Sequence, residues 1–151
     1  MDTHDLAQFS LFASLTPEQL GVLAPLFRRE THAAGEVLFN QSDRASDLYI
    51  IETGEIVLRH RPYDGGVLDI ETIKSGGLVG WSAVIGRAEY TSGAICLTPV
   101  QAIAIKGRDL RRVMRADKEL RATLTEGMAR IVAHRLDHFD DQLDKFFDGE
   151  E

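Results

Sequence analysis

The sequence of 151 residues contains a single cysteine, Cys96. One thiol cannot form an intrachain disulfide, so a disulfide-stabilised secreted scaffold is excluded. An iron–sulfur cluster held by four cysteines of the chain is excluded for the same reason. Long apolar runs are missing as well, because no stretch of the sequence approaches the roughly 20 apolar residues that span a bilayer. The composition therefore favours a protein of a reducing compartment.

Positive charge is also scarce. The chain has 17 Lys and Arg against 24 Asp and Glu, a net charge of −7, which disfavours diffuse attraction to polyphosphates such as nucleic acid. Its N-terminus, MDTHDLAQFSLFASL, is acidic where a secretory signal peptide would be basic. We therefore expect a cytoplasmic protein that binds no membrane and, on its own, no nucleic acid.

A hydrophobic content of 44% in a chain of this length is enough for one domain with its own core. We divide that domain into an N-terminal helical segment (1–30), a β-barrel (31–107) and C-terminal helices (108–148). In the first segment Thr16 is expected to cap a helix that begins at Pro17. The apolar stripe of this helix consists of Leu20, Leu23, Leu26 and Phe27.

Residues 31–107 follow a strand pattern punctuated by glycine-containing turns. We expect strands in the runs 37–39, 48–51, 56–58, 67–73, 94–97 and 100–105. From Arg108 to about Phe147 the apolar residues recur with the period of an α-helix. These patterns predict a mainly β fold with flanking helices, in which the strands form an antiparallel barrel or sandwich.

Three motifs follow one another in these expected strands and turns: GEVLFNQ at 35–41, DLYIIETGEI at 47–56 and GGLVG at 76–80. In order and spacing, over roughly residues 11–136, they resemble the cyclic-nucleotide-binding domain family. The resemblance implies an antiparallel jelly-roll β-barrel with N-terminal helices and two C-terminal helices, termed B and C. Glycines suit turns with positive φ and allow the main chain to approach a ligand phosphate closely.

The family's phosphate-binding cassette reads Gly-Glu, a short helix, and an arginine about nine or ten residues after the glutamate. The resemblance implies that the glutamate binds the ribose hydroxyl, the arginine pairs with the cyclic phosphate, and helix amides hold the phosphate oxygens. Here Trp81 stands at the glutamate position and Tyr90 at the arginine position. The candidate ligand-binding residues are Gly80, Trp81, Ser82, Ala83, Arg87, Tyr90, Thr91 and Ser92.

Replacement of the glutamate and the arginine is expected to weaken cyclic-nucleotide binding. Hydrogen bonds to charged groups contribute about 1.5–3 kcal/mol each, so losing both contacts corresponds to roughly 3–6 kcal/mol, or about 10²- to 10⁴-fold in affinity. Arg87 either supplies a phosphate partner from a shifted loop or is a solvent-facing residue at a loop tip. Trp81 and Tyr90 either line a pocket for a planar ligand or plug a vestigial one.

We interpret the chain as a non-catalytic regulatory domain that requires no cofactor and signals to an unidentified protein partner. A weakly bound cyclic nucleotide or another small ligand is the expected occupant of its pocket. No Ser/His/Asp or Cys/His constellation supports catalysis. Transcription regulators of this family continue into a helix-turn-helix module, which we do not expect here because the sequence ends about fifteen residues after Leu136. The basic cluster that begins the C-terminal helices is expected to be a solvated face and consists of Arg108, Arg111, Arg112 and Arg115.

Two alternatives remain. One is a metal-dependent barrel enzyme of the cupin type. The scattered positions of the histidines argue against it, because a metal site needs several ligands close together. These are His4, His32, His60, His134 and His138, of which the last two share a helix face but lack further ligand motifs. The other alternative is an interaction module whose pocket is closed.

The last helix carries an apolar seam that predicts a homodimer. Its residues recur at intervals of 4, 3, 4 and 3, as in a coiled coil: Val132, Leu136, Phe139, Leu143 and Phe146. Sedimentation analysis should show a dimer, and Leu136→Asp combined with Phe139→Asp should dissociate it. A monomer at high micromolar concentration would indicate instead that the seam folds back onto its own barrel.

Overall fold

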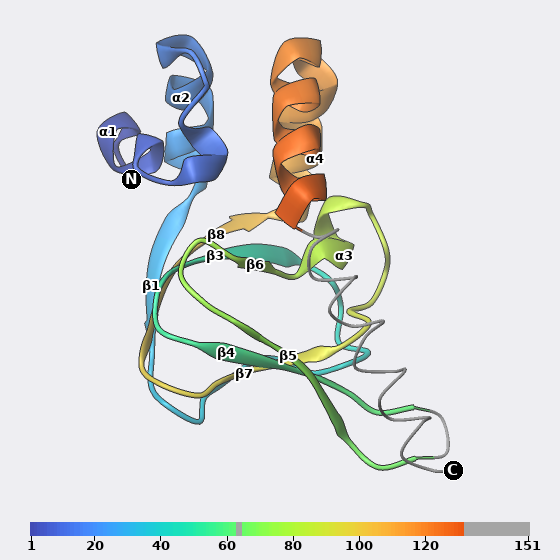
Figure 1. Cartoon of the computed structure of the whole chain (residues 1–151). Coiled ribbons are helices and arrows are strands. Elements are labelled where there is room, and N and C mark those ends of the chain that lie inside the picture. The colour runs from blue at the N-terminus through green and yellow to red at the C-terminus, as the bar shows by residue number, and fades with distance from the viewer. Residues whose placement is uncertain (63–64, 132–151) are drawn as a thin grey trace.

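Two four-stranded antiparallel sheets form the centre of the computed structural model, which describes residues 1–62 and 65–131 (Figure 1). This arrangement confirms the mainly β jelly roll with flanking helices. The first sheet has the order β1 (Arg28–His32), β8 (Val100–Lys106), β3 (Asp47–Thr53) and β6 (Leu78–Val79). The second has the order β2 (Val37–Phe39), β7 (Gly93–Cys96), β4 (Ile56–His60) and β5 (Leu68–Ile73).

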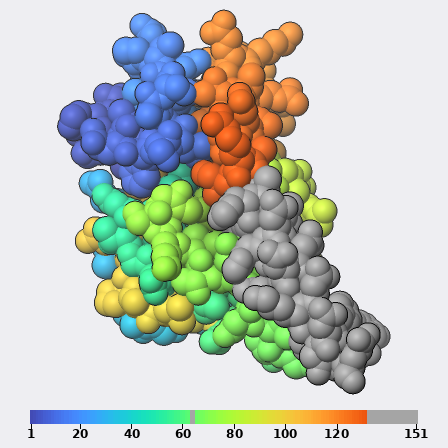
Figure 2. Space-filling model, viewed as in Figure 1, coloured from blue at the N-terminus to red at the C-terminus, as the bar shows by residue number. Residues whose placement is uncertain are grey.

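Helices cover one end of this barrel. Figure 1 shows the N-terminal helices and α4 together above the sheet that contains β8 and β3, and Figure 2 shows the blue N-terminal segment against the orange helices that follow β8. The helical elements are α1 (Thr3–Ala7), the 3₁₀ turn η1 (Ser10–Phe12), α2 (Pro17–Leu23), the 3₁₀ turn η2 (Ala24–Leu26), α3 (Trp81–Val84) and α4 (Gly107–Ala116). Residues 118–131 are helical again.

Helix α2 begins as its sequence predicts. The Thr16 side chain accepts a hydrogen bond from the Gln19 N–H (3.2 Å), and the Gln19 side chain accepts one from the Thr16 N–H (2.9 Å), which completes a capping box with Pro17 in the first turn. Leu20 and Leu23 of the expected stripe are buried. Local sequence therefore sets where this helix begins, and burial of its apolar stripe stabilises it.

Strands β3 and β8 are buried on both faces because each serves two cores. Leu48 and Ile50 of β3 belong to the core shared with the helices, whereas the alternating residues Tyr49 and Ile51 belong to the barrel core. Strand β8 divides in the same way, with Ile103 and Ile105 under the helices and Ala102 and Ala104 inside the barrel. A strand covered on both sides reads as a continuous apolar run, which is what both segments show.

Strand β1 was not expected from its sequence, RRETH, and it crosses the boundary that the sequence analysis placed after residue 30. It pairs with β8 at the edge of the first sheet, with Arg28 opposite Ala104 and His32 opposite Val100. Charged side chains are typical of edge strands, where they prevent association with other strands. Its polar composition is therefore a consequence of its position.

The structure does not describe the residues on which two expectations depend, the dimer seam and the histidine pair of the last helix. The seam residues Val132, Leu136, Phe139, Leu143 and Phe146 lie outside the described residues, and so do His134 and His138. Within the described residues, none of the helices combines the length and the apolar character needed to cross a membrane.

His32 lies in a small ionic cluster on the surface of β1. Its Nε2 is 2.8 Å from Glu30 Oε1, and its Nδ1 contacts Glu36 Oε2. Burial of the ring disfavours the imidazolium, but the hydrogen bonds with Glu36 and Glu30 outweigh it and raise the pKa of His32 above its usual value. The hydrogen bond with His32 lowers the pKa of Glu36 in turn.

This cluster predicts a pH dependence of stability. A raised pKa in the folded state means that protonated His32 stabilises the fold fully below its unfolded pKa of about 6.5, and the contribution is lost as pH rises through the folded value. Denaturant unfolding should therefore show greater stability near about pH 6 than about pH 8, and His32→Gln should reduce the difference. The control is His60→Gln, since His60 Nδ1 lies 3.1 Å from a backbone carbonyl, that of Thr91. An unchanged pH dependence in His32→Gln would contradict the prediction.

Candidate functional site

The candidate ligand-binding segment runs from Gly80 at the end of β6, through α3, to the start of β7. Gly80 adopts φ = 90°, and a Cβ there would lie 2.5 Å from the Asp47 carbonyl oxygen. Only glycine combines this backbone conformation with so close an approach. The segment is therefore held directly against the beginning of β3.

Tyr90 fixes the same two segments from the other end. Its hydroxyl donates to the Asp47 carbonyl (2.7 Å) and accepts from the Asp47 N–H (2.9 Å), while its side chain is 5% exposed. The ring stacks on Phe39, with centroids 3.7 Å apart and planes at 15°, and Phe39 in turn stacks on Tyr49 at 6.1 Å. Tyr90 is thus part of the barrel core, with its hydroxyl fully engaged.

The phenol of Tyr90 is neutral at physiological pH. Burial raises the pKa of Tyr90, more than the hydrogen bonds with Asp47 and Ser46 lower it. A neutral hydroxyl already committed to a backbone amide and carbonyl offers no charge to an anionic ligand.

Trp81 and Tyr90 belong to different cores. Trp81 is partly buried and packs against the core that the helices share with β3 and β8, whereas Tyr90 lies in the barrel core. The structure therefore does not bring these two rings together as one aromatic lining.

The other candidate residues divide between the interior and the surface. Ser82 and Ala83 are buried in α3; the Ser82 carbonyl accepts from the Arg87 N–H (3.0 Å), and the Ala83 N–H donates to Gly80 (3.0 Å). Thr91 is exposed and Ser92 half-buried at the entry to β7. Arg87 is exposed on the loop after α3.

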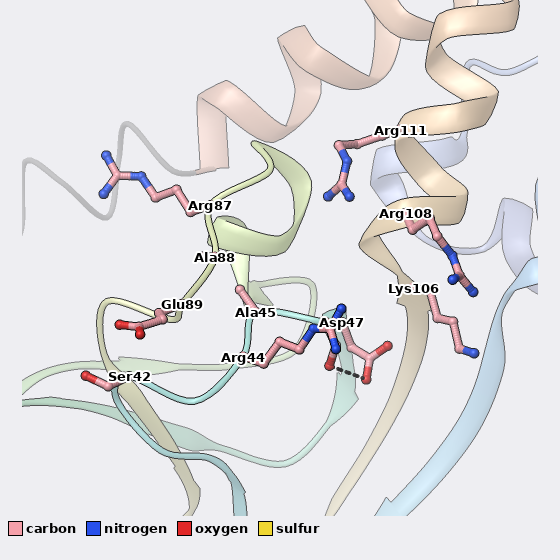
Figure 3. Close-up of a pocket in the computed structure, with 11 residues that line it drawn as sticks. Ser42, Arg44, Ala45, Asp47, Arg87, Ala88, Glu89, Lys106, Arg108 and Arg111 are labelled. Atoms are coloured by element: carbon pink, nitrogen blue, oxygen red, sulfur yellow. Dashed lines mark hydrogen bonds between the residues drawn. The ribbon is translucent and has the colours of Figure 1, made fainter.

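Arg87 lines a cleft of about 890 Å³ on the outside of the barrel (Figure 3). Three segments form its walls: the connection from β2 to β3, the loop between α3 and β7, and the junction of β8 with α4. Five of the lining residues are basic and two are acidic, in a chain whose net charge is −7. The lining consists of Ser42, Arg44, Ala45, Ser46, Asp47, Arg87, Ala88, Glu89, Lys106, Arg108 and Arg111.

The four arginines expected to form one solvated basic face do not all lie together, because only two of them, Arg108 and Arg111 but not Arg112 or Arg115, line the cleft. Arg112 instead lies 3.5 Å from Asp109. Arg44 carried no signal in the sequence, because its approach to the start of α4 depends on the pairing of β3 with β8. Helical spacing alone does not separate Arg111 from Arg112, because both, at i+3 and i+4, are surface neighbours of Arg108 on α4.

Metal ligands do not gather in the part of the chain that the structure describes. No three His, Cys, Asp or Glu side chains there are placed to hold one ion. His4, His32 and His60 lie on three separate elements, α1, β1 and β4.

A jelly-roll barrel with a turn, a short helix and a loop between β6 and β7, covered by helices at one end, places the chain in the class of helix-flanked jelly-roll domains. The comparison with known families gives the particular one. The cyclic nucleotide-binding domain family matches residues 29–117, and the chain belongs to this family.

Individual relatives agree with this assignment. The chain is 34% identical over 98 residues to the acetyltransferase Pat of Mycolicibacterium smegmatis and 23% identical over 134 residues to the cyclic AMP receptor protein of Thermus thermophilus. These matches cover 64% and 89% of this chain but only 28% and 60% of the relatives, so the chain spans part of their length. Among solved structures, a putative cyclic nucleotide-binding protein from Geobacter metallireducens is 27% identical with a TM-score of 0.78, covering 90% of this chain and 98% of its own.

We expect the Tyr90 hydroxyl to contribute measurably to the free energy of unfolding of the domain. Tyr90→Phe keeps the stacked ring but leaves the Asp47 N–H and carbonyl without this partner, which should lower the free energy of unfolding by about 1–3 kcal/mol in denaturant titrations. Tyr49→Phe is the matched control, because among the described residues the Tyr49 hydroxyl has no hydrogen-bond partner. Equal effects of the two changes would contradict a specific role of the Tyr90 hydroxyl.

Proposed function

We propose that this domain is a non-catalytic regulatory module whose barrel pocket is altered, so that it binds cyclic AMP and cyclic GMP weakly, and whose output passes to another protein. The observation that carries the proposal is the state of Tyr90, which is buried, neutral, stacked on Phe39 and hydrogen-bonded to Asp47. At this position the family resemblance implies an arginine that pairs with the cyclic phosphate.

The position of Trp81 supports the same conclusion. The resemblance implies a glutamate here that binds the ribose hydroxyl, and an indole cannot accept such a hydrogen bond. Trp81 instead packs against the core under the helices. Both polar contacts that the family makes with its ligand are therefore replaced by apolar packing.

The contact between α3 and α4 supports a regulatory output. Gly107, the first residue of α4, lies so close to the Ala83 carbonyl that a side chain at this position would overlap it, and Arg111 donates to the same carbonyl. A displacement of α3 towards α4 would therefore push α4 aside, and a displacement away from it would break the hydrogen bond of Arg111. Movement of packed helices against one another is a common means of switching between two states.

We infer from the net charge and from one relative that the domain signals to another protein rather than to DNA. A net charge of −7 disfavours DNA as the direct target, and the 34% identical relative is an acetyltransferase that contains a matching region within a longer chain. We propose a protein partner, reached from a homodimer that forms through the seam at the C-terminal end of the sequence.

A second candidate is an interaction module that takes no ligand in its barrel. The stack of Tyr90 on Phe39 favours it, because these rings occupy space inside the barrel core. The two candidates differ only in whether a small molecule binds beside α3.

Titration with cyclic AMP and cyclic GMP tests the proposal. Trp81 is the only tryptophan, so its fluorescence reports a ligand that binds at α3, and calorimetry should give dissociation constants weaker than about 1 μM. Trp81→Glu combined with Tyr90→Arg should tighten binding by up to about 10²- to 10⁴-fold, and by more than either change alone.

Calorimetry must serve for the variants, since Trp81→Glu removes the fluorophore, and thermal unfolding should verify that each variant is folded. Tight binding of either nucleotide by the unaltered protein would contradict the proposal. Folded variants that gain no affinity would show that the barrel lacks more than these two side chains.

A further inference from the structure

The basic cleft on the outside of the barrel meets the candidate ligand-binding segment only at the loop after α3, through Arg87, Ala88 and Glu89. None of the rings that fill the barrel core lines it, and of the candidate cassette residues only Arg87 does. The cleft is therefore a second candidate site of this domain.

Backbone hydrogen bonds join the three walls of the cleft. The Ala45 N–H donates to the Ala88 carbonyl (2.9 Å), and the Ser42 N–H donates to the Tyr90 carbonyl (2.9 Å), which tie the first wall to the second. The Gly107 N–H donates to the Ser46 carbonyl (2.9 Å), which ties the first wall to the third. The basic side chains thus project from a preformed backbone frame, which lowers the entropic cost of binding.

Most of the positive charge in the cleft is uncompensated. Within residues 1–62 and 65–131, Arg44, Lys106 and Arg108 form no ion pair. Of the two acidic lining residues, Asp47 already pairs with Arg28, whose Nη2 lies 3.2 Å from Asp47 Oδ2. An anion in the cleft would therefore meet free cations rather than established ion pairs.

Four of the five basic side chains are placed to act together. Figure 3 shows Arg44 reaching from its loop towards the start of β3, beside the junction that carries Lys106 and Arg108. Arg111 extends from α4 towards α3, where the Ala83 carbonyl holds its guanidinium. Arg87 points away from the Arg111 guanidinium and is not included in the proposed set.

We propose that this cleft binds a small phosphate-bearing molecule with at least two negative charges, independently of the barrel pocket. Guanidinium groups present paired N–H donors that match phosphate oxygens, and several of them around one hollow suit adjacent phosphates. A volume of about 890 Å³ lies in the range of small-molecule sites, and it exceeds what a single phosphate fills. A long polyanion is disfavoured, because the basic residues are confined to one hollow on a chain whose net charge is −7.

Calorimetric titration with inorganic tripolyphosphate and with ATP tests the proposal. Both probes should bind with a dissociation constant below about 1 mM at low salt, and more weakly at about 150 mM salt. Equal affinities would indicate recognition of phosphates alone, and tighter binding of ATP would indicate that the cleft also contacts the nucleoside; both results support the site.

Variants locate the binding. Arg44→Gln and Lys106→Gln, both at exposed positions, should each weaken binding by at least about tenfold. Arg112→Gln is the matched control: it removes the same charge from α4 but lies outside the cleft, so its effect should stay below about twofold.

Several results would overturn the proposal. These are an absence of binding heat at low salt, an equal loss of affinity in Arg112→Gln and Arg44→Gln, or displacement of tripolyphosphate by cyclic AMP, which would place the probe in the barrel. Tighter binding of a duplex of about 20 base pairs, lost in the same variants, would make the cleft a nucleic-acid surface instead. The binding heats and the comparison of variants do not depend on the affinity of the barrel for cyclic nucleotides, so they separate a failure of this proposal from a failure of the proposed function.

Discussion

The two-sided burial of β3 and β8 is the constraint on which the rest of the structure depends. Odd and even residues of these strands face different cores, so Ile50 and Ile103 support the helices while Tyr49 and Ala104 face the barrel. A shift of either strand by one residue would exchange these faces, which fixes the register strongly. Because the alanines of β8 are small, the barrel has room for the stacked rings of Phe39, Tyr49 and Tyr90.

The beginning of β3 brings the functional parts together. Asp47 receives the Tyr90 hydroxyl on its backbone, lies against Gly80, pairs with Arg28 through its carboxylate and lines the basic cleft. One residue thus connects the end of the cassette, the edge strand and the outer cleft. Its backbone contacts do not depend on its side chain, so the connection is a property of the fold rather than of one carboxylate.

Helix α3 lies between the two candidate sites. Its buried residues face the interior, while the Ala83 carbonyl accepts a hydrogen bond from Arg111 of the cleft and lies against Gly107 at the start of α4. A ligand that moves α3 or draws Arg111 away from Ala83 would act on the same helix junction. If the proposed functions hold, both sites would act on the C-terminal helices through this one contact between α3 and α4.

The sequence by itself determined the elements with local causes. The capping box of Thr16 and Gln19 set the start of α2, continuous apolar runs marked β3 and β8, and the glycine motifs identified the family. Tertiary structure decided what depends on distant partners. Strand β1 is polar because it lies at an edge, Trp81 and Tyr90 face different cores, and the cleft joins segments around residues 44, 88 and 108. Local patterns carry no information about such convergence, because sheet pairing brings these segments together only after the chain has folded.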